Sequence, residues 1–103
     1  MAAYVISDVE FLDPDGVTRY RALARDSIAK YGGRYIVRGG AIERVEGVWA
    51  PQAIVIVEFP SMERARGWYR SNEYAEALKV RQYALKRNLI FVEGAPSEVS
   101  ASH

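Results

Sequence analysis

The sequence predicts a single α+β domain in which helices cover one face of an antiparallel sheet, in the order strand, helix, strand, strand, helix, strand. Two observations lead to this prediction. Short segments rich in β-branched and aromatic residues alternate with period two, and longer segments between them repeat apolar residues every three or four positions. Turn and cap residues such as Asp-Pro, Gly-Gly and Pro-Ser separate these segments.

The first strand and helix are predicted from residue 3 to residue 31. Ala3–Phe11 reads as a strand with Tyr4, Ile6, Asp8 and Glu10 on one face and Val5, Ser7, Val9 and Phe11 on the other. Asp13 is the expected N-cap of a helix that begins at Pro14, and Gly32-Gly33 ends that helix. Its buried face is predicted from the three- and four-residue spacing of Val17, Tyr20, Leu23, Ala24, Ile28 and Tyr31.

The second and third strands follow. Residues 34–37 resume an extended pattern, which Gly39-Gly40 interrupts before residues 41–45 continue it; such a glycine pair indicates a bulge or a close backbone approach. Residues 46–51 form the turn. Residues 52–59 are the most apolar stretch, which predicts a central strand covered on both faces.

The second helical region is predicted to bend. Ser61 is the expected N-cap for residues 62–69, and Ser71-Asn72 is expected to restart the helix at a new angle. The apolar stripe of the second part is predicted to contain Tyr74, Ala77, Leu78, Arg81 and Leu85. Residues 89–93 supply the last strand, so residues 1–94 form one domain and residues 95–103 a disordered tail.

This order is that of the ferredoxin-like βαββαβ fold. On the strand over residues 52–59, Ile54 and Ile56 alternate with Val55, Val57 and Phe59, so both faces are apolar. A two-layer domain leaves one sheet face to solvent, and an apolar solvent face needs a cover. We therefore expect a homodimer whose two sheets pack face to face in a shared, barrel-like core.

Composition argues against several classes of function. Lys and Arg number 14 and Asp and Glu 13, with no block of like charge, so neither nucleic acid nor an anionic membrane is an expected partner. The chain has no cysteine, and its one histidine is His103, so no metal site and no cofactor is expected. Neither a signal peptide nor a membrane span is evident, and we expect a cytoplasmic protein.

Four charged residues stand where the pattern favours apolar ones: Asp8, Arg38, Glu58 and Arg81. Arg38 is expected to share a face with Ile36, and Arg81 to lie in the helical stripe. Half-buried charges need partners, so the four are expected to converge on one another or on a ligand. Two interpretations stay open: a structural network, or a site whose arginines bind a carboxylate, phosphate or enolate oxygen. An arginine partner lowers a carboxylate pKa, which argues against a catalytic base.

The aromatic residues of the second helical region form the other candidate. Trp68 and Tyr69 lie on the inner face of its first part, and Ser71 and Tyr74 follow at the bend. They are either ordinary core or the wall of an apolar slot with a few hydroxyl donors, as small-molecule sites have.

The chain resembles the family catalogued as domain of unknown function 1330 (DUF1330). The resemblance covers roughly residues 3 to 94 and lies in the order and spacing of Ala3-Tyr4-Val5-Ile6, Gly32-Gly33-Arg34, Val37-Arg38-Gly39-Gly40, Glu46-Gly47, Glu58-Phe59-Pro60-Ser61, Trp68-Tyr69-Arg70-Ser71, Glu73-Tyr74 and Arg81. It implies a dimeric α/β-barrel of ferredoxin-like subunits. It implies no catalytic residues, because the family has no settled activity. The wider dimeric α/β-barrel group includes cofactor-independent monooxygenases, lactone isomerases and small dehydratases or cyclases, an analogy of fold only.

Two functions are predicted from different classes. In the first, a small-molecule binding protein or cofactor-independent enzyme holds a small anionic, partly apolar ligand between sheet and helices. Arg38 and Arg81 hold the anion, Asp8 and Glu58 orient the arginines, and the ligand-pocket walls are Trp68, Tyr69, Ser71 and Tyr74. The alternative is a non-catalytic dimeric module that regulates or assembles with a protein partner.

Overall fold

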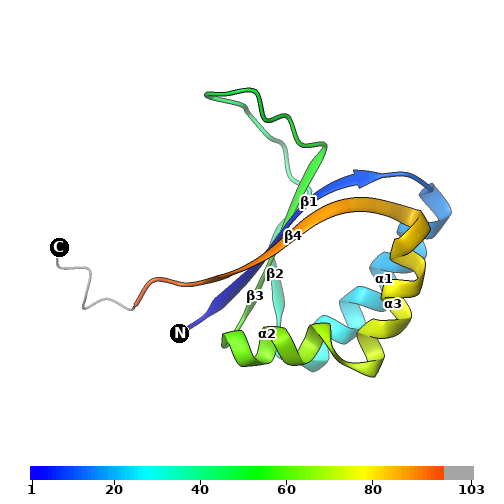
Figure 1. The fold of residues 1–103 in the computed structure, drawn as a ribbon, viewed down its shortest axis with the longest axis vertical. Coiled ribbons are helices and arrows are strands. Elements are labelled where there is room, and N and C mark those ends of the chain that lie inside the picture. The colour runs from blue at the N-terminus through cyan, green and yellow to red at the C-terminus, as the bar shows by residue number, and fades with distance from the viewer. Residues whose placement is uncertain (97–103) are drawn as a thin grey trace.

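The computed structural model describes residues 1–96 of the chain. Its elements are β1 (Ala3–Phe11), α1 (Pro14–Lys30), β2 (Arg34–Arg38), β3 (Ala53–Phe59), α2 (Met62–Tyr69), α3 (Asn72–Ala84) and β4 (Leu85–Glu93). The strands form one antiparallel sheet in the order β2-β3-β1-β4, and the helices lie together on one side of it (Figure 1). This is the ferredoxin-like arrangement, with the second helix divided into α2 and α3.

The pairing register decides which residues face the helices. On β1, Val5 lies opposite Val57 of β3 and opposite Phe91 of β4. Directly paired residues share a face of the sheet. The face toward the helices, called the inner face here, therefore carries Ala3, Val5, Ser7, Val9 and Phe11 of β1 with their partners on β3 and β4. The outer face carries Tyr4, Ile6, Asp8 and Glu10 with theirs, as predicted for β1.

The three helices begin at the predicted caps. Asp13 Oδ2 accepts from the Gly16 N–H at 2.9 Å, and Ser61 Oγ accepts from the Arg64 N–H at 3.1 Å. Ser71 Oγ accepts from the Tyr74 N–H at 3.0 Å, so the chain ends α2 and starts α3 in a new direction (Figure 1). These side chains satisfy backbone donors that have no partner inside a helix. The predicted bend at Ser71-Asn72 is confirmed.

The core fills the space between the inner face and the helices. Trp68 and Phe59 stack with ring centroids 5.3 Å apart, and Trp68 and Tyr74 with centroids 4.1 Å apart. The indole N–H of Trp68 donates to Ser27 Oγ at 3.0 Å, so the most polar atom of this large side chain is satisfied inside the core. Because Ser27 belongs to α1 and Trp68 to α2, this hydrogen bond also ties the two helices together.

The segment between β2 and β3 differs from the prediction. β2 ends at Arg38, and the expected continuation over residues 41–45 is wrong: residues 39–52 form no strand. Gly39 has φ +72°, and its N–H makes the last hydrogen bond to β3, to Ile54 O. Beyond it the segment leaves the sheet and extends away from the helices (Figure 1), so no neighbouring strand can pair with it.

The bulge also lies earlier than Gly39-Gly40. The β2–β3 register shifts between Tyr35 and Val37, so that Tyr35 lies opposite Val57 and Arg38 opposite Val55. A bulge reverses the alternation of side chains beyond it. Arg38 consequently shares the inner face with Tyr35 and not, as expected, the face of Ile36.

The junction of α3 and β4 brings two further corrections. The buried residues of α3 are Tyr74, Ala77, Val80 and Ala84, so Val80 takes the stripe position that was predicted for Arg81. The helix then passes directly into β4, which begins at Leu85 and not at Leu89. Of the predicted tail, residues 95–103, the part from residue 97 onward lies outside the described residues.

Candidate functional site

A cavity of about 80 Å³ lies between the inner face and the helices. Most of its lining is apolar and comes from the sheet and from the helices α1 and α2, including Val5, Val9, Val17, Ile28, Val55, Val57 and Trp68. The polar side chains that line it are Ser7, Tyr20, Arg21, Tyr35, Arg38 and Arg87. A mainly apolar cavity with a few polar groups is the usual composition of a small-molecule site.

Among these polar residues, Arg87 is fixed by two hydrogen bonds from its guanidinium group. It lies on the inner face of β4, opposite Val9 of β1. Its Nη1 donates to Tyr20 Oη at 2.8 Å and its Nη2 donates to Tyr74 Oη at 2.7 Å. The two phenol oxygens are themselves 2.5 Å apart. We call Tyr20, Tyr74 and Arg87 the Arg87 cluster; it joins α1, α3 and β4 at the cavity.

At neutral pH the guanidinium of Arg87 is charged and the phenol of Tyr74 is neutral. Burial raises the pKa of the Tyr74 phenol well above its ordinary value, so this phenol stays protonated. Burial acts to lower the pKa of Arg87, but the phenols of Tyr20 and Tyr74 more than offset it and the pKa is raised. The cluster therefore presents the positive charge of Arg87 and the neutral hydroxyl of Tyr74.

Two further arginines lie at the exposed part of the lining. The Arg38 guanidinium lies 4.2 Å from the ring centroid of Tyr35, and that of Arg21 lies 5.2 Å from the ring centroid of Phe11. Burial raises the pKa of Tyr35, and Arg38 partly opposes this effect. Within residues 1–96, none of Arg21, Arg38 and Arg87 forms an ion pair with a carboxylate. The cavity thus carries three positive charges that the described chain does not neutralise.

The structure does not bring the four predicted charged residues together. Asp8 and Glu58 lie on the outer face, away from the cavity. Asp8 Oδ2 accepts from Trp49 Nε1 at 3.0 Å. Glu58 Oε1 accepts from Arg34 Nε at 2.7 Å and Glu58 Oε2 from Tyr4 Oη at 3.1 Å. The hydrogen bonds from Arg34 and then Tyr4 lower the pKa of Glu58, so this carboxylate suits an ion pair and not a general base.

Of the two predicted arginines, only Arg38 lines the cavity. Arg81 is half-buried on α3, and its Nε is buried without a hydrogen-bond partner in the described chain. It is not part of the cavity lining, because Val80 occupies the buried position of that turn.

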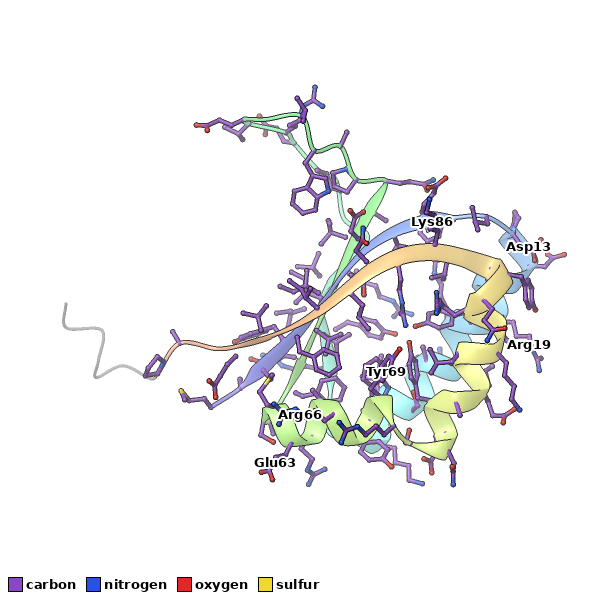
Figure 2. All side chains as sticks on the ribbon, in the orientation of Figure 1. Asp13, Arg19, Glu63, Arg66, Tyr69 and Lys86 are labelled. Carbon is purple, nitrogen blue, oxygen red and sulfur yellow. The ribbon has the colours of Figure 1, made fainter. Side chains whose placement is uncertain are left out.

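The four aromatic and hydroxyl candidates take different positions. Trp68 lines the cavity directly, and Tyr74 reaches it through the hydrogen bond to Arg87. Tyr69 lies between the helices and the sheet (Figure 2), where it packs against Trp68 and Phe91 with centroids 6.0 Å and 6.1 Å away. Ser71 is the N-cap of α3, and its hydrogen bond to the Tyr74 N–H places Tyr74 at the start of that helix.

Sequence reasoning missed Arg87 and treated Tyr20 only as part of a helical stripe. Arg87 was placed between a helix and a strand that was expected to begin at Leu89. A signal was present: Leu85, Arg87, Leu89 and Phe91 alternate with Lys86, Asn88, Ile90 and Val92. Had this period-two pattern been extended backward, it would have placed Arg87 on the apolar face of the last strand.

Residues 1–96 contain no group of three or more His, Cys, Asp or Glu side chains arranged to hold a metal ion. Among the helices of this part of the chain, none has the length and apolar character needed to cross a bilayer.

Comparison with known proteins identifies the family. The sequence profile of the domain of unknown function DUF1330 matches residues 2–95. The chain belongs to this family. None of the curated proteins is similar to this DUF1330 chain at a significant level.

Solved structures confirm the fold of the DUF1330 chain. A protein of unknown function from Rhodopseudomonas palustris is 25% identical, with a TM-score of 0.69 over 93% of this chain and 84% of that one. A dimeric ferredoxin-like protein of unknown function from Thermobifida fusca is 15% identical, with a TM-score of 0.64 over 91% and 92%. A candidate antibiotic biosynthesis monooxygenase from Nitrosomonas europaea is 11% identical, with a TM-score of 0.53 over 90% and 89%.

Proposed function

We propose that this DUF1330 chain binds a small anionic, partly apolar molecule in the cavity between sheet and helices. The observation that carries the proposal is the set of three guanidinium groups, from Arg21, Arg38 and Arg87, that line the cavity with no carboxylate partner in the described chain. Arg87 is half-buried, and a half-buried charge without a counter-ion has a cost that a bound anion removes. Arg21 and Arg38 are exposed and add positive charge at the same cavity. The apolar walls supply the surface for the rest of the ligand.

The proposal is one of binding. A general base needs a group that accepts a proton near neutral pH. The phenols of Tyr35 and Tyr74 do not meet this need, because burial raises the pKa of each further above neutrality. The likeness to a candidate monooxygenase concerns the fold, so no reaction is carried over from it.

Ligand binding can be followed by the fluorescence of Trp68, which lines the cavity. The chain has two tryptophans, so Trp49→Phe leaves Trp68 as the single reporter. We expect a saturable signal with a panel of small carboxylates (isobutyrate, benzoate and phenylacetate) and a weaker one with the matching amides. Calorimetry on the unmodified chain supplies the control for Trp49→Phe. Absence of saturable binding by any carboxylate in both assays would overturn the proposal.

We propose that the chain acts as a homodimer joined through the outer sheet face. That face carries exposed apolar side chains on β2 and β4, with Ile90 56% and Val92 40% exposed, and the half-buried Ile6, Ile54 and Ile56 between them. Exposed apolar patches on a sheet mark contacts with another chain. The likeness in fold to a dimeric Thermobifida fusca protein supports a homodimer.

The dimer is tested by light scattering after size-exclusion chromatography. The unmodified chain is expected to have twice the monomer mass of 11.6 kDa. Ile90→Lys is expected to give monomers, because two-fold pairing would bury like charges. Arg66→Glu is the matched control, since Arg66 is an exposed residue of α2 (labelled in Figure 2) and not of the sheet, and it should leave the mass unchanged. A monomeric unmodified chain would refute the homodimer.

A further inference from the structure

We infer that the anionic group of the ligand is a carboxylate, and that it binds at Arg87 and Tyr20 of the Arg87 cluster rather than at the exposed arginines Arg21 and Arg38. This inference rests on the proposed function, because it names the chemistry of the same cavity's ligand. It follows from the hydrogen-bond donors that the cluster leaves without an acceptor.

The surroundings of the two hydroxyl groups decide which of them donates. Tyr20 Oη and Tyr74 Oη share one hydrogen bond, and each oxygen also accepts one N–H from Arg87. Tyr74 is fully buried, so a proton pointing away from Tyr20 would have no partner. An unpaired buried hydroxyl costs about 1–3 kcal/mol. Tyr74 is therefore the donor and Tyr20 the acceptor, which leaves the proton of Tyr20 free.

The free proton of Tyr20 is available to the cavity. Tyr20 lines it, whereas Tyr74 does not. No other hydrogen bond from Tyr20 Oη is formed in the described chain. The Tyr20 hydroxyl is thus a donor without an acceptor, at the surface of the cavity.

Arg87 adds more free donors at the same place. A guanidinium has five N–H groups, and Arg87 uses two of them, one from Nη1 and one from Nη2. Its Nε makes no hydrogen bond in the described chain, and it is not sealed in the core: among residues 1–96 only Arg81 has a fully buried nitrogen without a partner. The hydrogen bonds to Tyr20 and Tyr74 hold the guanidinium plane in place before a ligand arrives.

The cavity offers these donors no acceptor of opposite charge. Its lining contains no Asp, Glu, Asn or Gln side chain. The group that completes the site therefore accepts hydrogen bonds and carries a negative charge. Arg21 and Arg38 are exposed to solvent, so Arg87 is the one half-buried cation among the three arginines of the cavity. A carboxylate at the cluster balances that single charge, whereas a phosphate dianion there would add an excess negative charge. A carboxylate also fits the planar fork of arginine in bidentate fashion.

The rest of the ligand is apolar and short. The walls beside the cluster are aliphatic, among them Val9, Val17 and Leu85, and the cavity volume is about 80 Å³. This space suits a branched aliphatic group or one aromatic ring. The inferred class is thus small monocarboxylates with an apolar body.

Benzoate and benzamide provide the test, because they share a shape and differ in charge. Calorimetry should show that Arg87→Met weakens benzoate binding about tenfold or more, the size expected for a charged hydrogen bond, with little change for benzamide. Tyr20→Phe should weaken benzoate about three- to tenfold. Arg38→Met should have a smaller effect than Arg87→Met. Arg19→Met, which removes an exposed arginine of α1 (Figure 2), is the matched control and should change neither affinity.

The outcomes separate this inference from the proposed function. If Arg38→Met or Arg21→Met abolishes benzoate binding while Arg87→Met retains it, the inference is wrong and the proposed function stands. If the unmodified chain binds no small carboxylate, the proposed function itself fails. Inorganic phosphate that displaces benzoate at equal concentration would also overturn the inference. If Arg87→Met does not fold by circular dichroism, Tyr20→Phe decides the matter, and unchanged benzoate affinity then refutes the assignment.

Discussion

The hydroxyl oxygens of Tyr20 on α1 and Tyr74 on α3 lie 2.5 Å apart, and their rings meet edge to face with centroids 6.3 Å apart. Both oxygens accept from Arg87 of β4. One small hydrogen-bond network at the wall of the cavity therefore joins α1 to α3 and β4, which are distant from it in sequence. The network makes α1, α3 and β4 mutually dependent, and it links the packing of the fold to the proposed ligand site.

Tyr74 makes the stability of the fold depend on alkaline pH. Its folded-state pKa lies above the unfolded value of about 10, so the unfolded chain loses this proton first and folding weakens as pH rises above about 10. Tyr74→Phe removes the titrating group and one hydroxyl. We expect this variant to be about 1 kcal/mol less stable at pH 7 and the difference to shrink at alkaline pH. Urea unfolding of both proteins across pH measures it; a difference that stays constant would contradict the assignment.

Ser27 is expected to matter through its hydrogen bond to Trp68. Ser27→Ala leaves the buried indole N–H without an acceptor, since Ser27 Oγ accepts it at 3.0 Å. We expect a loss of about 1–3 kcal/mol in the free energy of unfolding. The neighbouring Asp26→Ala is the control, because the exposed Arg25–Asp26 ion pair contributes little. Equal losses in the free energy of unfolding for the two substitutions would show that the buried hydrogen bond contributes no more to stability than the exposed ion pair.

Ser71 is expected to stabilise the start of α3. Ser71→Ala removes the oxygen that accepts from the Tyr74 N–H, at a cost of about 1 kcal/mol. Ser71→Gly should cost less, because glycine is a tolerated cap residue. Thermal melting followed by circular dichroism distinguishes the variants. A Ser71→Gly variant that is clearly less stable than Ser71→Ala would argue against a capping role.

Gly33 has no room for a side chain. A Cβ there would lie 2.7 Å from Phe59 Cε1 and 2.8 Å from Ile28 Cγ2, both in the core. We expect Gly33→Ala to destabilise the fold by about 1–3 kcal/mol through overpacking. Gly40→Ala is the matched control, since a Cβ at Gly40 meets no atom within 4 Å, and it should be neutral or slightly stabilising. Chemical denaturation of the two variants checks the difference, and equal midpoints would be evidence against close packing at Gly33.

The sequence alone was sufficient for the local features of the fold. Asp13, Ser61 and Ser71 cap helices because capping needs only a side chain and the backbone a few residues along the chain. The bounds of β1 and its two faces follow from period-two alternation in the same way. The element order, read from these signals, matches the structure.

Only the tertiary structure decided which polar residues meet. The bulge between Tyr35 and Val37 turned Arg38 to the inner face, and no residue in that stretch indicates a bulge. The helix α3 runs into β4 without a turn, so Arg87 lies on the inner face of β4 and lines the cavity, whereas Arg81 does not. Asp8 and Glu58 found Trp49 and Arg34 as partners on the outer face. Caps and alternation depend on neighbours along the chain, whereas these pairings depend on register and on contacts between distant segments, which a local pattern does not contain.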